Sequence, residues 1–215
     1  MAQSQKLKVT LLIVVLAAGL VVGIRYFAWK KIQTMDSVAF RKQGDPQSPI
    51  KIVEYIDLQC PACAYGSQQL QGIIEQNAHK IYLEIRFHPL GVHVHSMAAT
   101  KFALCAGQQG KFWPFLHLIL KRQQSWSELT DPQPAFLEVV KDIQLNQNAV
   151  LACTNDDELR VKILEEKDAG AALGIKSTPT YFINGKMVVG VASMLDEVYR
   201  LLGIPKPAQP FPFTN

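Results

Sequence analysis

The stretch VEYIDLQCPACAYG, residues 53–66, places Cys60 and Cys63 directly after an apolar run, separated by two residues. Such a pair can bind a metal, crosslink the fold or exchange disulfides with other proteins. Structural zinc needs four ligands, usually with a second closely spaced pair, and the other two cysteines of this chain are isolated. A disulfide across two residues closes too small a loop to constrain the unfolded chain. The spacing therefore favours redox exchange, and no metal site is expected.

The residues around this pair predict a strand, a helix and a second strand. Residues 49–56 (PIKIVEYI) are rich in β-branched side chains, and residues 81–87 (IYLEIRF) alternate apolar and polar side chains. Such a βαβ unit has parallel strands and a right-handed crossover. A helix that begins at Cys60 directs its positive end at that sulfur and lowers its pKa, and Cys63 then lies one turn further on, placed to resolve a mixed disulfide.

The rest of the chain predicts helices followed by a hairpin and a last helix. Residues 96–173 show no strand pattern and contain several helical segments divided by Gly, Pro and Ser. The turn Asn184-Gly185 between two apolar runs is a strong hairpin signal. SMLDEVYRLLG then predicts a helix with Ser193 as its N-cap. The order βαβ, helices, ββα indicates one α/β domain with a helical insertion.

CPAC at a strand-to-helix junction, STPTYFING (residues 177–185) before a hairpin, and the helical block between them resemble the DsbA-like thiol-disulfide oxidoreductases of the thioredoxin superfamily. The resemblance covers residues 49–203. It implies a thioredoxin fold with an inserted all-helical subdomain and no cofactor. In that family the first cysteine is the exposed nucleophile and the second resolves the mixed disulfide, which assigns these roles to Cys60 and Cys63.

The resemblance also assigns a substrate-binding segment. Pro61 and Ala62 correspond to the active-site loop between the two cysteines. Thr178-Pro179 looks like the family's cis-proline, which faces the disulfide and presents backbone groups of the preceding residue to the substrate. The alternative for Pro179 is a trans proline that begins an edge strand.

Glu54 is the third expected catalytic residue. It lies six residues before the pair, where thioredoxin-like proteins keep a buried acid, and it shares its strand parity with Ile52 and Ile56. A buried carboxyl group has a raised pKa and can relay a proton to or from Cys63. The alternative is a salt-bridged strand glutamate with no catalytic part. Asp57 has the opposite parity and is expected to serve the loop.

Two interpretations exist for Cys105 and Cys153, which fall in the helical block. They can be free, buried cysteines that act as small hydrophobes. Alternatively, they form a structural disulfide, which similar proteins often have within the helical insertion.

The amino-terminal segment predicts a membrane anchor. Residues 9–24 carry no charge and are followed by Arg25 and three aromatic residues, which together give a single span over residues 9–29. A cleavable secretory signal is the competing interpretation. The expected division of the chain is an anchor (1–29), a linker (30–48), the first thioredoxin-like part (49–92), the helical insertion (93–173), the second thioredoxin-like part (174–204) and a proline-rich tail (205–215).

Charge argues against a nucleic-acid partner. Residues 1–31 hold five basic and no acidic residues, which leaves 17 basic against 18 acidic residues in the remainder. The body of the protein therefore lacks the positive surface that phosphate backbones require.

Together these features predict a monomeric thiol oxidase that introduces disulfides into reduced, exported proteins. We expect it to be held by its anchor in the inner membrane, with the catalytic domain on the periplasmic side, and to be reoxidised by a membrane partner resembling DsbB. Ala62 stands where the best-known oxidases have His, and Thr178 recurs in related isomerases and reductases, so these activities are the alternatives. A further alternative is a non-enzymatic copper-binding module that uses both thiols as soft ligands.

Overall fold

The computed structural model describes Gly19 and residues 39–207. Apart from Gly19, the predicted anchor at residues 9–29 lies outside the described residues, and so does most of the predicted tail. Within the described part of the chain, no helix combines the length and the apolar character needed to cross a bilayer.

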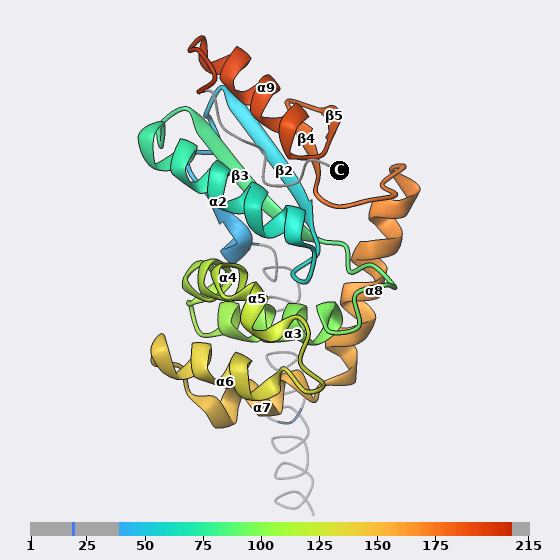
Figure 1. Cartoon of the computed structure of the whole chain (residues 1–215). Helices are drawn as coiled ribbons and strands as arrows, with labels where there is room; N and C mark the ends of the chain where they lie inside the picture. Colours follow the sequence, from blue (N-terminus) through green and yellow to red (C-terminus); the bar gives the residue numbers. More distant parts are fainter. Residues whose placement is uncertain (1–18, 20–38, 208–215) are drawn as a thin grey trace, which may run out of the picture. The chain divides into compact units, whose positions relative to one another are not determined.

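Residues 40–207 form one compact unit around a mixed sheet, whose strand order is β1-β3-β2-β4-β5 (Figure 1). The strands β2 and β3 are parallel, and every other neighbouring pair is antiparallel. The strands are β1 (Lys42–Gln43), β2 (Ile50–Ile56), β3 (Ile81–Phe87), β4 (Thr180–Ile183) and β5 (Lys186–Val189).

The central strand β2 explains why the stretch before the cysteines is so apolar. It is flanked by β3 on one side and β4 on the other, and only Lys51 within it is exposed. A strand covered on both faces reads as a nearly continuous hydrophobic run. Its register pairs Glu54 with Ile85 of β3 and with Tyr181 of β4, so two residues far apart in the sequence meet in the middle of the sheet.

Two helices belong to the thioredoxin-like part, and six form the insertion. Figure 1 shows α3 to α7 grouped at the carboxyl end of β2, where α2 begins, while α8 runs back toward the sheet. The helices are α2 (Pro61–Gln76), α3 (Ser96–Gln108), α4 (Phe112–Lys121), α5 (Gln123–Trp126), α6 (Gln133–Asp142), α7 (Gln147–Thr154), α8 (Asp157–Ala172) and α9 (Val191–Leu202).

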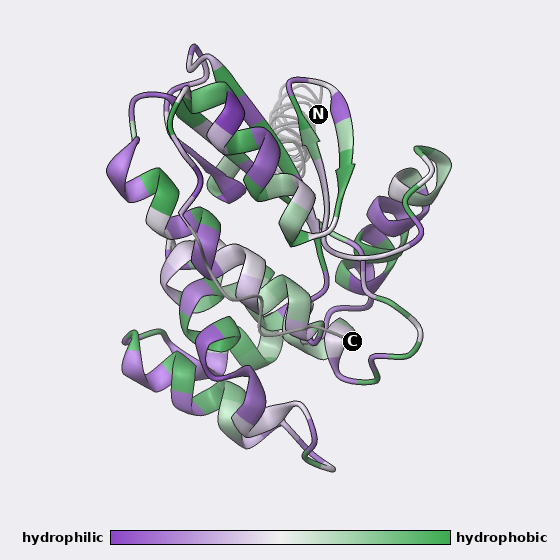
Figure 2. Cartoon of the chain, turned by 45° about the horizontal axis from the view of Figure 1, so that its top comes forward, coloured by the Kyte–Doolittle hydropathy of each residue, from purple (hydrophilic) through white to green (hydrophobic). Residues whose placement is uncertain are grey.

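The insertion has its own aromatic core, closed by a disulfide. Phe102, Phe115, Trp126 and Phe136 are buried and pack ring against ring. Hydrophobic and hydrophilic residues alternate in bands along the helices, as expected when each helix buries one face (Figure 2). A disulfide joins Cys105 of α3 to Cys153 of α7, so the second of the two interpretations is the one the structure contains.

The segment predicted as a linker, residues 30–48, contributes to the domain at its carboxyl-terminal end. The 3-10 helix η1 (Ala39–Arg41) leads into β1, and the Arg41 guanidinium lies 2.8 Å from both carboxylate oxygens of Glu166 on α8. Glu166 also accepts a hydrogen bond from the backbone amide of Phe87. These contacts are non-local, and a polar stretch with Gly and Pro does not reveal them.

The N-cap expected for the last helix is wrong. The helix α9 begins at Val191, and Gly190 occupies the N-cap with a φ of 80°. The Gly190 amide donates to the Pro179 carbonyl oxygen, which ties the end of β5 to the start of β4. The left-handed backbone that glycine permits lets the hairpin lead directly into the helix, so Ser193 falls inside the first turn.

Removal of the disulfide should weaken the insertion. In the chain-entropy model, a crosslink between residues separated by 48 positions contributes about 4 kcal/mol to the free energy of unfolding. We expect the Cys105→Ala/Cys153→Ala variant to lose stability by this order in urea unfolding without dithiothreitol. With dithiothreitol present, wild type and variant should have nearly equal free energies of unfolding. A difference that persists would show that the substitutions weaken side-chain packing.

Candidate active site

The two cysteines lie at the beginning of α2, immediately beyond the carboxyl end of β2. The N-cap is Cys60 itself, Pro61 is the first helical residue, and Cys63 follows within the first turn. Both are free thiols; Cys60 is 7% exposed, whereas Cys63 is completely buried. One sulfur of the pair is therefore placed to meet another protein, and the other is shielded.

The surroundings shift the two thiols in opposite directions. The pKa of Cys60 is lowered to about 6, first by the hydrogen bond from the Cys63 thiol and further by the Cys63 backbone amide and the Thr178 side chain, against the effect of burial. Burial raises the pKa of Cys63 well above its ordinary value, and the neighbouring Cys60 sulfur raises it further. At neutral pH, Cys60 is a thiolate and Cys63 is a thiol that donates to it.

The segment before β4 faces the cysteine pair. The Thr178-Pro179 peptide bond is cis, as the family resemblance implies, and the Cys60 sulfur lies 3.5 Å from the Thr178 carbonyl oxygen. A Cβ atom at Gly66 of α2 would lie 2.5 Å from the Tyr181 hydroxyl oxygen, which is closer than atoms approach. Glycine at this position leaves room for the Tyr181 side chain of β4 to pack against α2, next to Pro179.

The expected buried acid is present on β2. Glu54 is 1% exposed, and the Ser67 hydroxyl donates to its Oε1 atom over 3.3 Å. Burial raises its pKa to about 8, although the nearby hydroxyl groups of Ser67 and Tyr181 oppose the rise. Glu54 has no ion-pair partner in the described part of the chain. The carboxyl group therefore carries a proton at neutral pH and can give or take one in the same range.

A small cavity adjoins Glu54. It holds about 20 Å³, room for roughly one water molecule, and is lined by Glu54, Ser67 and Gln71 together with Trp113 and His117 of α4. Burial lowers the pKa of His117, so this ring is neutral at pH 7. The other lining residues are mostly apolar and include Leu70, Ile74, Leu83, Ile85 and Leu116, in keeping with the burial that raises the Glu54 pKa.

Two residues of the site were not identified from the sequence. Tyr181 is fully buried in β4, and the nearby charges of Glu54, Cys63 and Cys60 add to burial in raising its pKa, so its hydroxyl lies near both the acid and the sulfurs. Gln123 of α5 donates to the backbone oxygen of Cys60. In the sequence, a tyrosine inside TYFI indicates strand core, and one of the two adjacent glutamines in RQQSW carries no signal at all.

Asp57 serves the loop, as expected from its strand parity. It is fully buried, and its Oδ1 atom accepts the Gln59 amide. Its Oδ2 atom accepts the Leu90 amide at 2.7 Å and lies 2.8 Å from His93 Nδ1. Across residues 39–207, no three His, Cys, Asp or Glu side chains are grouped so that they could hold a metal ion.

Comparison with known proteins agrees with this architecture. A family model described as thioredoxin matches residues 37–202. Among solved structures, alpha-DsbA1 of Wolbachia pipientis is 23% identical, with a TM-score of 0.66 over 76% of this chain and 89% of that chain. Oxidised BdbD of Bacillus subtilis is 14% identical, with a TM-score of 0.66 over 79% and 95% of the two chains. The structural likenesses establish a thioredoxin fold with a helical insertion.

A curated relative is much longer than this chain. Na(+)/H(+) antiporter NhaA 1 of Salinispora arenicola is 28% identical over 145 residues, which are 67% of this chain and 21% of the antiporter. The chain thus spans about a fifth of the length of the curated relatives it matches. The antiporter name describes those longer proteins.

Glu54 should make stability depend on pH. The folded protein keeps the Glu54 proton up to about pH 8, whereas the unfolded chain loses it near pH 4.5. The native state therefore binds more protons between these values, and stability falls as pH rises. We expect reduced Glu54→Gln protein to match wild type near pH 4.5 and to exceed its free energy of unfolding by on the order of 4 kcal/mol at pH 8. If the free energies of unfolding of the two proteins change in parallel with pH, the Glu54 carboxyl group is not held protonated in the folded state.

Alkylation should report the Cys60 thiolate. The rate at which the reduced protein reacts with iodoacetamide should rise with a midpoint near pH 6, because the thiolate is the nucleophile. Cys63→Ala should move the midpoint upward, since it removes the largest cause of the lowered pKa. Cys60→Ser is the control and should show almost no reaction while folded. A wild-type midpoint near the ordinary thiol pKa of about 8.5 would contradict the assigned electrostatics.

Proposed function

We propose, from the premise that this chain belongs to the thioredoxin family, that the protein introduces disulfides into other proteins through Cys60 and Cys63. The broader class is a thiol-disulfide oxidoreductase of the DsbA type. The observation that carries the proposal is the opposite shift of the two thiol pKa values at the start of α2, beside Thr178.

The oxidised protein contains a Cys60–Cys63 disulfide. A substrate thiolate attacks the Cys60 sulfur, a mixed disulfide forms, and the electron pair of the broken bond passes to the Cys63 sulfur. Because burial raises the pKa of Cys63, this sulfur takes a proton, and protonated Glu54 is the buried group able to supply it. The step leaves Cys63 as a neutral thiol inside the protein.

A second substrate thiolate then attacks the substrate sulfur of the mixed disulfide. The substrate disulfide forms and Cys60 leaves as a thiolate, while the proton of the second substrate thiol goes to solvent. Two electrons have passed from the substrate to the cysteine pair. A sulfur with a pKa of about 6 is a better leaving group than an ordinary thiol, so the surroundings of Cys60 favour this direction.

Thr178 is suited to hold the substrate chain beside Cys60. Its backbone lies next to the reactive sulfur, at the beginning of β4, and an extended peptide can pair with such a segment through main-chain hydrogen bonds. Main-chain pairing is independent of side-chain identity. This suits an enzyme that acts on many reduced polypeptides.

We further propose that the catalytic unit lies on the periplasmic side of the inner membrane, as a monomer anchored by residues 9–29. The uncharged run at residues 9–24 supports the anchor, and the Cys105–Cys153 disulfide supports an oxidising compartment. Each turnover reduces the cysteine pair, so a partner must accept two electrons. A membrane protein resembling DsbB fits this role.

One observation favours the alternative activities, in which the reduced protein acts as a reductase or an isomerase. The pKa of Cys60, about 6, lies between the values of about 7 for thioredoxin and about 3.5 for DsbA. Ala62 between the cysteines adds no charge that would lower it further. The reduction potential therefore distinguishes oxidase from reductase.

The decisive experiment equilibrates the full chain with glutathione buffers and then offers the oxidised protein a reduced, unfolded test protein. An oxidase should have a potential well above the value of about −270 mV for thioredoxin and should form disulfides in the test protein. A potential near that of thioredoxin would instead assign a reductase or isomerase.

Matched variants separate enzyme from copper binder. Cys63→Ser, offered a test protein that already contains disulfides, should accumulate a mixed disulfide in which the Cys60 thiolate has displaced one substrate sulfur, because the resolving thiol is missing. Cys60→Ser should lose all turnover. Binding of one Cu(I) by wild type, with no disulfide turnover under any condition, would replace the enzyme with a metal-binding module.

A further inference from the structure

A second buried carboxyl group lies next to the cysteine pair and has no part in the exchange described above. Asp57 is completely buried three residues before Cys60, and its backbone oxygen accepts the Cys60 amide over 3.1 Å. Glu54 has hydroxyl neighbours and keeps its proton at neutral pH, whereas the Asp57 side chain is surrounded by nitrogen donors. A negative charge so close to the reactive sulfur changes the energy of a thiolate there unless another group offsets it.

Three N–H groups of the described residues contact the Asp57 carboxylate. The Gln59 amide donates to Oδ1 over 2.8 Å, the Leu90 amide donates to Oδ2 over 2.7 Å, and His93 Nδ1 lies 2.8 Å from Oδ2. An ionised carboxylate can only accept hydrogen bonds, so the contact with His93 requires a proton on Nδ1. The ring therefore donates to Asp57 whether it is neutral or positively charged.

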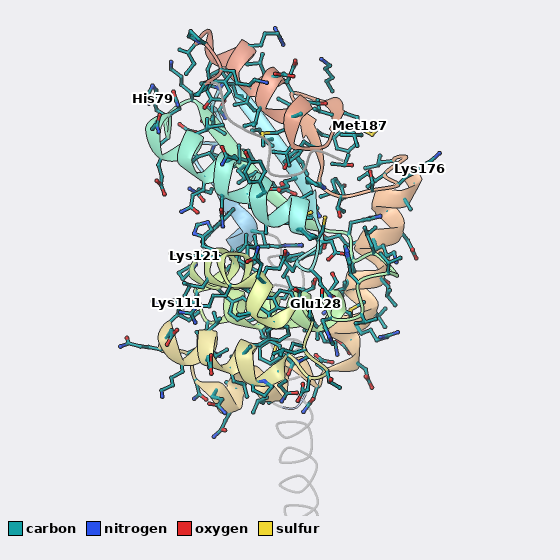
Figure 3. The ribbon with its side chains drawn as sticks, viewed as in Figure 1. His79, Lys111, Lys121, Glu128, Lys176 and Met187 are labelled. Atoms are coloured by element: carbon teal, nitrogen blue, oxygen red, sulfur yellow. A yellow bond between two sulfur atoms is a disulfide. The ribbon has the colours of Figure 1, made fainter. Side chains whose placement is uncertain are left out.

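His93 is the only ion-pair partner of Asp57 in the part of the chain that the structure describes. His88 also lies near Asp57, but burial and the charge of Lys167 on α8 lower the pKa of His88, so this ring is neutral at pH 7. Lys176, in the segment that leads to β4, is exposed and points away from the fold (Figure 3). Among the described residues, only His93 is thus placed to offset the negative charge.

The two members of the pair differ in exposure. The Asp57 side chain is inaccessible to solvent, whereas that of His93 is 21% exposed, in the connection between β3 and α3. This connection is also fixed by contacts that do not involve the ring, because Asp57 holds the Leu90 amide and Gln59 Oε1 accepts the His95 amide over 2.6 Å. The imidazole can therefore be removed while the connection stays attached to the redox loop.

The charge of Asp57 opposes the stabilisation of the Cys60 thiolate. The hydrogen bond from the Cys63 thiol is the largest cause of the lowered Cys60 pKa, and the Asp57 charge acts in the other direction. Pro61 and Ala62, between the two cysteines, carry no charge that could add to either effect. The oxidised pair contains no thiolate, so a nearby negative charge disfavours the reduced form relative to the disulfide.

We propose that Asp57 and His93 together set the reduction potential of the Cys60–Cys63 pair: the buried carboxylate makes the pair less oxidising, and the imidazole offsets part of this effect. The inference rests on the proposed function, because the potential decides in which direction disulfides are exchanged. Reduction adds two electrons and one proton to the disulfide and gives the Cys60 thiolate and the Cys63 thiol. Asp57 and His93 are positioning residues, since they act on a substrate only through the Cys60 sulfur.

The test measures the potential of full-length variants in glutathione buffers at pH 7. Asp57→Asn keeps the shape of the side chain and removes its charge. It should shift the equilibrium roughly three- to tenfold toward the reduced protein, which raises the potential by about 15 to 30 mV. His93→Leu removes the donor that offsets the carboxylate and should shift the equilibrium about threefold toward the oxidised protein.

A double variant tests whether the two residues act as a pair. Without the carboxylate charge, loss of the imidazole should have little further effect, so Asp57→Asn/His93→Leu should have the potential of Asp57→Asn alone. His95→Leu is the matched control. His95 belongs to the same connection, but its Nε2 atom lies 2.7 Å from the Leu129 carbonyl oxygen and its ring makes no contact with Asp57, so its removal should leave the wild-type potential.

A purely structural role would give a different pattern. If the pair only held the loop, both single substitutions would loosen the same contacts, and the two potentials would shift in the same direction or not at all. Either result overturns the inference. The midpoint of iodoacetamide alkylation is a second readout, and it should lie below the wild-type value in Asp57→Asn and above it in His93→Leu.

The outcomes separate this inference from the proposed function. If wild type forms no disulfides in a reduced test protein, the oxidase proposal fails, while opposite shifts in the two variants still support the pair. If wild type is an oxidase and both variants keep its potential, the inference is overturned and the oxidase proposal stands. Should Asp57→Asn fail to fold, His93→Leu decides: an unchanged potential, or a change that His95→Leu shares, overturns the inference.

Discussion

The close approach of α2 to β4 at Gly66 is the constraint on which the redox site depends. A methyl group at this position would overlap the Tyr181 hydroxyl and would contact Val191 at 3.0 Å, so either the helix or the buried tyrosine side chain would have to shift. The approach sets the first turn of α2 beside the Thr178-Pro179 segment. Cys60 then has the helix amides on one side, which stabilise a thiolate, and the Thr178 carbonyl oxygen on the other.

The same packing gives the two cysteines different surroundings: Cys60 lies at the outer end of the pair, and Cys63 lies in the interior. The helix start holds Cys60 as an anion, while the interior keeps both Cys63 and Glu54 protonated because neither charge is solvated there. The two groups that keep a proton at neutral pH therefore lie in the interior, and Cys60 lies at the outer end of the pair. Tyr181 lies between the two regions and contributes a hydroxyl group to the interior.

The helical insertion does more than cover this site. Its disulfide and aromatic core hold the helices α3 to α7 together. From α5, the Gln123 side chain donates a hydrogen bond to the Cys60 carbonyl oxygen. Asp57 and Gln59 bond the loop before Cys60 to Leu90, His93 and His95 and to the Ser127 carbonyl oxygen.

Local patterns were sufficient to predict the βαβ unit, the hairpin, the helical insertion, the reactive cysteines and the parity that buries Glu54, because strand alternation and helix spacing are properties of short segments. The cis peptide bond and the Cys105–Cys153 pairing followed from the resemblance to a family and not from the residues alone. The roles of Tyr181, Gln123 and Arg41 arise only from contacts between segments distant in the chain. Such contacts depend on how the sheet and the insertion pack together. A sequence does not distinguish a tyrosine or a glutamine that contacts a reactive sulfur from one that faces solvent.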